Sequence, residues 1–388
     1  MNQRQLFLNH IAQTSPSPLM LEIERAEGIY LYAPDGKKYL DMISGISVSN
    51  IGHCHPQVVK AIQDQSQRFM HLMVYGEYVY APQVLLAKEL TTLLPSELDN
   101  FYFTNSGTEA VEGALKLAKR FTGRSEIISF KNAYHGSTAG ALSIMGSEEY
   151  KTNYRPLVPD STLLDYNCID SLNNITEHTA AVVVELIQAE AGVIVGMPEF
   201  IAKLSAKCTE VGALMIVDEI QTGCGRTGAF FAIEHYNFVP DILLIGKGFG
   251  GGMPIAAFIA NKSIMNAISH EPILGHISTF GGNAVCCAAA LATLKVIKDE
   301  IDMNEVELKG ALIESEFRKL GYDKINRKGL MMSIDNGSMQ DNFSLVEQCI
   351  QKGIITDWFL FNPSSMRICP PLTITESQIM EFIELIKK

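Results

Sequence analysis

Short runs of four or five mainly apolar residues recur along the chain, separated by longer segments whose apolar residues follow a helical spacing. A run that is apolar at every position indicates a strand buried on both faces, and its alternation with helices is typical of a parallel sheet that helices cover. The runs predict strands at 100–103, 126–130, 180–184, 213–217, 242–245 and 255–259. The spaced segments predict helices at 56–73, 81–94, 107–120, 198–211 and 284–299. We therefore expect an α/β fold with a mainly parallel central sheet.

The two ends of the chain follow a different pattern. Residues 1–20, which contain Pro16 and Pro18, are expected to form an irregular arm. Residues 23–42 alternate apolar and polar positions around Asp35-Gly36, a strong hairpin signal. Beyond about residue 300 the chain is more charged, and two amphipathic helices surround short strands near 324–335 and 353–356.

These patterns predict a division into domains. We expect a large domain over residues 46–295, and a smaller α+β domain formed by residues 1–45 and 296–388. Within the large domain, 147–180 is expected to be loop with a short helix.

The composition narrows the class of protein. The chain has 388 residues, of which 47% are hydrophobic and 19% charged, which is enough for a sizeable core. Its net charge of −12 argues against nucleic acid as the main partner, and no run approaches the ~20 apolar residues of a membrane span. The N-terminus is too polar for a signal peptide. The eight cysteines form no paired motif and are expected to be reduced thiols in a cytoplasmic protein, and no metal site is expected.

A lysine follows one of the predicted strands. The run Ile242–Ile245 ends in Gly246, Lys247 and a glycine-rich segment. A lysine at the end of a buried strand loses hydration, which lowers its pKa and makes the amine nucleophilic, as a Schiff-base lysine requires. A surface lysine beside a flexible loop remains an alternative reading of this segment. A phosphate-binding P-loop is disfavoured, because there the glycines precede the lysine.

Asp218 ends the predicted strand at 213–217. Neighbouring parallel strands would bring Asp218 and Lys247 to the same edge of the sheet. A carboxylate facing a lysine suggests a cofactor between them, with the carboxylate keeping a ring nitrogen protonated. That is the arrangement used by pyridoxal phosphate (PLP).

Two longer motifs surround these residues: DEIQTGCGRTG from Asp218, and PDILLIGKGFGGGMPIAAFIA around Lys247. They resemble the signature of the class III aminotransferases of PLP fold type I, the family of acetylornithine, ornithine and 4-aminobutyrate aminotransferases. The resemblance spans roughly residues 20–375. It implies a homodimer with PLP bound at the subunit interface, Lys247 carrying the cofactor and Asp218 holding its ring nitrogen.

The resemblance also implies further cofactor contacts. Ser106, Gly107 and Thr108 begin a predicted helix, whose free N–H groups can bind a phosphate, and would form the phosphate cup. Tyr134 would stack on the cofactor ring, although a simple core position is the alternative. The other implied contacts are His135, Gln221 at the 3-hydroxyl, and Ser278 with Thr279, the threonine reaching the phosphate of the neighbouring subunit.

Three charged residues are candidates for substrate binding. Glu185 and Glu190 follow a predicted strand and suggest a polar gate. Arg367 lies in RICPPL, which resembles the family motif whose arginine binds a substrate carboxylate, or pairs with the glutamate corresponding to Glu190 when that carboxylate is absent. A surface arginine is the alternative. Ser137 stands where several relatives have a carboxylate-binding arginine, which is a departure from the family pattern.

The expected function is PLP-dependent transfer of an amino group. The donor would be an amino acid or a terminal amine, acetylornithine-like, ornithine-like or ω-amino, and the expected acceptor is an oxo acid such as 2-oxoglutarate. An isomerase on the same scaffold (racemase, epimerase or aminomutase) is the alternative, because it would keep the same cofactor residues. A catalytically silent binding protein is disfavoured by the presence of both Lys247 and Asp218. A nicotinamide-dependent dehydrogenase is disfavoured because no G-x-G-x-x-G follows an early strand.

Overall fold

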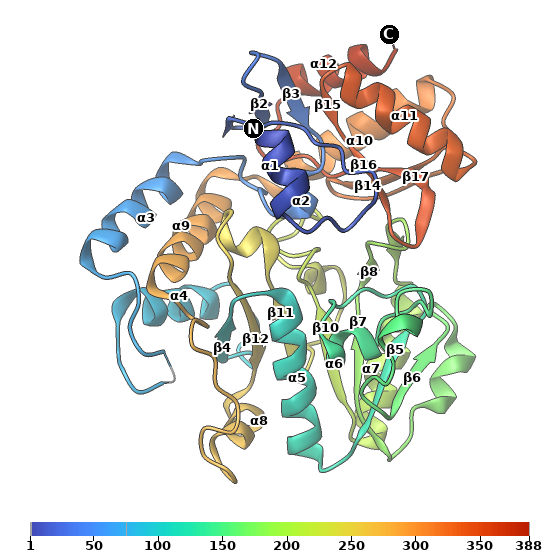
Figure 1. The fold of residues 1–388 in the computed structure, drawn as a ribbon. Coiled ribbons are helices and arrows are strands. Elements are labelled where there is room, and N and C mark those ends of the chain that lie inside the picture. The colour runs from blue at the N-terminus through green and yellow to red at the C-terminus, as the bar shows by residue number, and fades with distance from the viewer. Residues whose placement is uncertain (1, 75, 388) are drawn as a thin grey trace.

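The computed structural model describes residues 2–74 and 76–387, and its centre is a seven-stranded sheet with the order β4-β12-β11-β10-β7-β5-β6 (Figure 1). Its strands are β4 (Asn100–Thr104), β5 (Glu126–Phe130), β6 (Ser161–Leu164), β7 (Thr179–Val184), β10 (Leu214–Asp218), β11 (Ile242–Ile245) and β12 (Ala256–Ala260). β12 is antiparallel to both of its neighbours, and the other adjacent pairs are parallel. The prediction of a mainly parallel sheet is confirmed.

Helices cover both faces of this sheet, so its central strands are buried at every position. Helix α5 (Gly107–Thr122) packs on β7, β11 and β12, and Gly113 permits this close approach because a Cβ there would overlap the Phe258 ring. The opposite face is covered by α3 (Pro56–Arg68), α4 (Ala81–Thr91), α7 (Pro198–Val211) and α9 (Ala284–Glu300). Along β11, Leu243 and Ile245 face this second core, whereas Ile242 and Leu244 face α5. The sheet is thus a rigid support for the loops at its edges.

A smaller unit combines both ends of the chain, as Figure 1 shows by the blue strands beside the red segment. One of its sheets has the order β1-β2-β3-β15 and the other β13-β14-β17-β16. β15 pairs in parallel with β3, which joins the C-terminal segment to the N-terminal one. The strands are β1 (Arg25–Glu27), β2 (Tyr30–Tyr32), β3 (Lys38–Asp41), β13 (Ile325–Lys328), β14 (Met331–Asp335), β15 (Ile354–Ile355), β16 (Asp357–Phe359) and β17 (Asn362–Ile368). A separate core lies here, which supports the predicted two-part organisation, while the boundaries at 45 and 295 stay predictions.

The remaining elements are short or belong to the smaller unit. The helices are α1 (Gln3–His10), α2 (Ser44–Ser47), α6 (Ala139–Ser143), α8 (Lys262–Met265), α10 (Met303–Lys319), α11 (Met339–Gln351) and α12 (Glu376–Lys387). The 3₁₀ turns are Thr152–Tyr154, Ile169–Asn174, Ala232–His235, Lys247–Gly250 and Asn266–Ser269. A two-stranded ribbon, β8 (Ile187–Gln188) and β9 (Ile194–Val195), follows β7. Among the described residues, each helix is too short or too polar to span a bilayer.

Four predictions about elements were wrong. The arm contains α1, which Asn2 and Gln5 stabilise through a capping box although none of its residues is buried. The segment 147–180 contains β6, an edge strand whose apolar part is too short to stand out. The C-terminal region has a third helix, α12, and α3 ends at Arg68 rather than near residue 73.

Candidate active site

The loops that follow five strands meet at one edge of the central sheet. Ser106 follows β4, Tyr134 follows β5, Glu185 follows β7, Asp218 ends β10 and Lys247 follows β11. Val217 lies opposite Val184, and Asp218 opposite Leu244. Because these strands run in the same direction, the predicted residues are brought to the same edge, which is where open α/β sheets place their ligand sites.

Lys247 has an unusual backbone conformation. Its φ is +46°, a left-handed value that costs a non-glycine residue of order 1–3 kcal/mol and is concentrated at functional sites. The next residue, Gly248, lies close to Asn50, because a Cβ on Gly248 would be 2.5 Å from the Asn50 side chain. Burial lowers the pKa of the Lys247 amine, although the nearby Glu190 acts in the opposite direction. Its Nζ donates no hydrogen bond to another described residue, so the amine is available to a ligand.

Asp218 is only 4% exposed and is held on both oxygens. Oδ2 lies 2.7 Å from His135 Nδ1, and Oδ1 accepts the Ile220 N–H at 3.0 Å. His135 is buried, and its Nε2 has no partner among the described residues. The predicted cofactor residue His135 therefore contacts Asp218 and fixes the orientation of that carboxylate.

The start of α5 presents backbone donors at the same edge. Ser106 Oγ accepts the Glu109 N–H at 3.3 Å, while the N–H groups of Gly107 and Thr108 have no acceptor among the described residues. A Cβ on Gly107 would lie 2.8 Å from the Ile220 side chain. Because glycine has no side chain, the start of α5 can pack against Ile220, two residues after Asp218. Free N–H groups and the helix dipole make such a position suitable for an anion.

Glu185 is bound to backbone rather than turned toward an open space. Its Oε2 accepts the Tyr134 N–H at 3.1 Å, and its Oε1 accepts the Ala189 N–H at 3.4 Å. Burial, reinforced by the charge of Asp218, raises the pKa of Glu185 well above its ordinary value. The carboxyl group therefore positions Tyr134 and the loop that leads to Glu190. The Tyr134 hydroxyl lies 3.4 Å from Ser137 Oγ.

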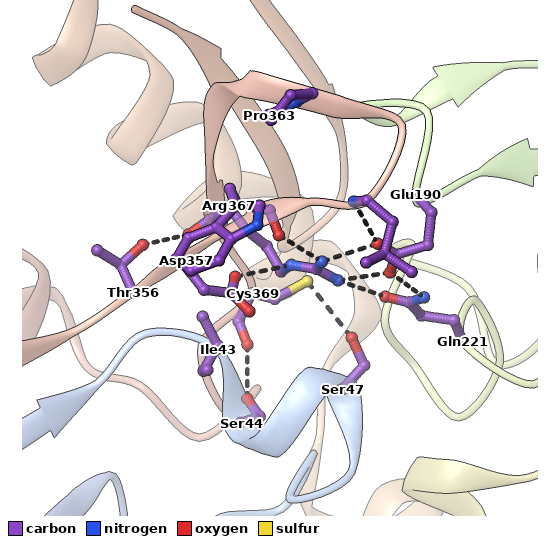
Figure 2. A network of polar contacts seen from close by, with 12 residues as sticks. Ile43, Ser44, Ser47, Glu190, Gln221, Thr356, Asp357, Pro363, Arg367 and Cys369 are labelled. Atoms are coloured by element: carbon purple, nitrogen blue, oxygen red, sulfur yellow. Dashed lines mark hydrogen bonds and ion pairs between the residues drawn. The ribbon is translucent and has the colours of Figure 1, made fainter. Parts of the chain in front are cut away.

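Arg367 is the centre of the polar network in Figure 2, and it is 3% exposed. Nη1 and Nη2 donate to the two oxygens of Glu190 at 2.8 and 2.9 Å. Nη1 also donates to Gln221 Oε1 at 3.3 Å, Nη2 to the Trp358 carbonyl at 2.8 Å, and Nε to Asp357 Oδ1 at 2.9 Å. All N–H groups of the guanidinium thus have an acceptor, and its carbon lies 4.6 Å from the centre of the Phe359 ring.

Glu190 is held by more than the arginine. Its Oε2 accepts the Leu360 N–H at 3.1 Å, and its Oε1 accepts from Gln221 Nε2 at 3.3 Å. Burial alone would raise the pKa of Glu190, but the Arg367 guanidinium outweighs it and brings that pKa to about 2. The predicted Glu190–Arg367 pair is therefore present, and the predicted cofactor residue Gln221 lies against it.

Asp357 is a site residue that sequence reasoning missed. Burial raises its pKa to about 6, although the Arg367 charge opposes this. Asp357 and Arg367 are opposite each other in the β16–β17 hairpin. Cross-strand pairing in this hairpin was the signal that could have identified the contact.

A left-handed turn next to this network was also missed. The segment labelled α2 in Figure 1 has positive φ at each of its four residues, Ser44 to Ser47. Ser44 Oγ donates to the Cys369 carbonyl at 2.6 Å, and Ser47 Oγ lies 3.4 Å from Cys369 Sγ (Figure 2). Gly45 is the only one of these four residues whose type commonly adopts positive φ, so the sequence gives little indication of this conformation.

The predicted residues Ser278 and Thr279 lie at the margin of the candidate active site. Ser278 Oγ accepts from Asn105 Nδ2 at 3.1 Å and so lies near the start of α5. Thr279 is exposed and lines a cavity of about 430 Å³ together with Thr104, Asn105 and Glu109. Within residues 2–74 and 76–387, no three His, Cys, Asp or Glu side chains are grouped so as to hold a metal ion.

Comparisons with known proteins agree with one another. The family model described as Aminotransferase class-III matches residues 11–388. The acetylornithine aminotransferase of Archaeoglobus fulgidus is 38% identical over 97% of this chain and 97% of its own. The [LysW]-aminoadipate semialdehyde/glutamate semialdehyde transaminase of Sulfurisphaera tokodaii is 41% identical over 81% of each chain. A solved structure of the ornithine aminotransferase from Toxoplasma gondii, with PLP at partial occupancy in its active site, is 29% identical with a TM-score of 0.91, covering 98% of this chain and 92% of its own.

Proposed function

Because the chain belongs to the class III aminotransferases, it is a PLP-dependent aminotransferase, and we propose that it moves an amino group from a terminal amine or an amino acid to a 2-oxo acid. The observation that carries the proposal is the meeting of Lys247, Asp218 and the start of α5 at one edge of the sheet. The relatives named above are aminotransferases, and none is an isomerase.

The residues at this edge fit the cofactor. The free N–H groups of Gly107 and Thr108, with Ser106, would bind its phosphate, and the Tyr134 ring would stack on it. Asp218 would hold the ring nitrogen, and the unpaired Lys247 Nζ would carry the cofactor covalently. The remaining proposed contacts are His135 through Asp218, Gln221, Ser278 and Thr279.

The side chains of this chain then supply orientation and proton transfer. PLP, when bound, supplies an aldehyde that takes up the amino group and a ring that withdraws electrons from the reacting carbon. Asp218, fixed by His135 and the Ile220 N–H, would keep a proton on the ring nitrogen. Lys247 Nζ, whose pKa burial lowers, would take a proton from the substrate carbon that bears the amino group and deliver it to the carbon that was the cofactor's aldehyde. The donor carbon is oxidised to a carbonyl and the acceptor carbonyl is reduced to an amine, so no external oxidant is needed.

The state of Arg367 supports a donor without a carboxylate beside the reacting carbon. With Glu190 bound to it, Arg367 has no open donor, so the site is electrostatically satisfied before any carboxylate enters. A terminal amine, such as that of an ω-amino acid or an ornithine-type compound, could then be accommodated with the Glu190–Arg367 pair intact. For a substrate carboxylate to bind Arg367, Glu190 would have to move away.

The half-reaction with donor alone tests this function. Holoenzyme mixed with a panel of terminal amines, ornithine, N-acetylornithine and ω-amino acids should lose the absorption of the aldehyde cofactor and gain that of its amino form. A 2-oxo acid should then reverse the change. An isomerase would return the aldehyde form without an oxo acid, and this result would contradict the proposal.

We propose that the active unit is a homodimer with its sites at the subunit interface. Large apolar side chains are exposed near the α4 and 273–280 segments, among them Val79 (91% exposed) and Ile273 (76%). A cavity of about 820 Å³ lies between these segments. Apolar exposure of this extent marks an interaction surface, and Thr279 lies beside it.

The free thiol state of all eight cysteines supports a cytoplasmic location.

Charging this surface should break the dimer. Val79→Asp is expected to raise the dimer dissociation constant by at least about tenfold, because a buried unpaired carboxylate opposes association. Light scattering over a concentration series measures it. Val239→Asp is the control. Val239 is also exposed (40%), but it lies just before the first residue of β11, whereas the active site lies after the last one. Equal dimer dissociation constants in the two variants would show that the interface lies elsewhere.

A further inference from the structure

We propose that the acceptor is a 2-oxo acid with a single carboxylate, of which pyruvate is the simplest, and that a dicarboxylate such as 2-oxoglutarate is a poor acceptor. This inference rests on the proposed function and specifies its second substrate. It departs from the 2-oxoglutarate expected from the family resemblance.

Arg367 has one edge that a substrate can occupy. Nε is bound to Asp357 and one N–H of Nη2 to the Trp358 carbonyl, and both partners belong to the hairpin that carries Arg367 itself. The other edge, formed by Nη1 and Nη2, binds Glu190, which lies on the separate β8–β9 ribbon. Exchange of Glu190 for a substrate therefore frees room for one bidentate carboxylate.

No second cation is available in the segments that form the site. Apart from Arg367 and Lys247, the segments 41–56, 104–109, 131–155, 185–193, 218–229, 246–252, 276–283 and 357–368 contain four Lys or Arg residues, Lys131, Lys151, Arg155 and Arg226. Lys131 pairs with Asp165 at 2.6 Å, and both Lys151 and Arg155 pair with Glu148 at 3.0 and 2.6 Å.

Arg226 cannot serve either. It is fully buried and donates to the Leu330 and Pro370 carbonyls and to Asn50 Oδ1, so it connects backbone segments. Lys247 is needed for the chemistry.

A second substrate carboxylate would meet an unfavourable environment. Ser137 and the Tyr134 hydroxyl are neutral. The displaced Glu190 would add a negative charge to a site that already contains Asp218. A carboxylate taken from water without a cationic partner loses more hydration than neutral hydroxyls restore. The site thus selects against the longer dicarboxylic acid by charge rather than by length.

A matched set of acceptors separates charge from length. Holoenzyme with one terminal-amine donor is assayed with pyruvate, 2-oxopentanoate and 2-oxoglutarate. The last two have the same five-carbon chain and differ in a terminal methyl group against a carboxylate. We expect kcat/KM for 2-oxopentanoate and for pyruvate to exceed that for 2-oxoglutarate by at least about tenfold. A value for 2-oxoglutarate equal to or above that for 2-oxopentanoate would overturn the inference.

Adding the missing cation should change the ranking. Ser137→Arg is expected to raise kcat/KM for 2-oxoglutarate at least about tenfold while that for pyruvate changes less than about threefold. Ser137→Gln, which adds length without charge, is the control and should leave the ranking as in the wild type. Equal gains in both variants would show that bulk, not charge, decides, and would count against the inference.

A binding measurement keeps the test independent of turnover and of the variants. Trp358 is the sole tryptophan of the chain, and its carbonyl accepts from Arg367, so its emission should report exchange at the arginine. In wild-type holoenzyme, titration with pentanoate should give a lower dissociation constant than titration with glutarate. Tighter binding of glutarate would overturn the inference and leave the proposed function intact. If no donor produces the amino form of the cofactor and no 2-oxo acid consumes it, the proposed function itself fails.

Discussion

Replacing Lys247 by alanine is expected to lower kcat by at least about 10⁴-fold, because both the covalent attachment and the proton transfer depend on Nζ. The variant should still bind PLP, since the start of α5, Tyr134 and Asp218 are unchanged. Steady-state kinetics and absorption spectra measure the two effects separately.

A matched control shows that the loss belongs to this lysine. Lys203→Ala removes an exposed α7 lysine paired with Glu199, and it should keep wild-type turnover. Small primary amines added to Lys247→Ala should restore part of the proton transfer and none of the attachment. Turnover of the alanine variant above about 1% of wild type would contradict the role given to Nζ.

The second large effect is expected at Arg367. Loss of a bidentate charge pair in a desolvated site costs about 2–5 kcal/mol, so Arg367→Ala should weaken the acceptor half-reaction about 30-fold to several thousand-fold. A donor without a carboxylate should suffer far less, because its half-reaction leaves Arg367 paired with Glu190. Single-turnover rates for the two halves, measured on one preparation, give the comparison.

Removal of Arg367 also leaves Glu190 and Asp357 buried without their cation, which destabilises the fold. Arg367→Ala/Glu190→Gln reduces that penalty and should show the same selective loss, and thermal unfolding identifies variants that are folded. Arg367→Lys keeps the positive charge but cannot make the bidentate contact of a guanidinium. Its rate for the acceptor half-reaction should fall between those of the wild type and the alanine variant. Equal damage to both half-reactions in the double variant would make the arginine structural.

The sequence predicted best what depends on burial and local signals. β5, β11 and α7 have the predicted limits, because short, mainly apolar runs and a proline at a helix start are strong local signals. The same parallel strands bring Asp218, Glu185 and Lys247 together, so their meeting at one edge followed from strand direction. The antiparallel direction of β12 could not be predicted in this way, because the pattern of an apolar run is the same in both directions.

What escaped prediction depends on partners distant in the sequence. Asp357 looks like an ordinary strand residue until the hairpin places it opposite Arg367. The left-handed turn at Ser44–Ser47 is held by Cys369, more than 300 residues away, and nothing in its own composition requires it. Likewise, Glu185 looks like a substrate residue by position, yet its oxygens bind the backbone of Tyr134 and Ala189.

The central claim is that the lysine with the strained backbone, Lys247, carries the cofactor at the edge where Asp218 lies. Reduction of the holoenzyme with borohydride, followed by digestion and mass spectrometry of the peptides, tests it most directly. The account predicts one pyridoxyl group per chain, on the peptide that contains Lys247. A pyridoxyl group on any other lysine, with Lys247 unmodified, would contradict it.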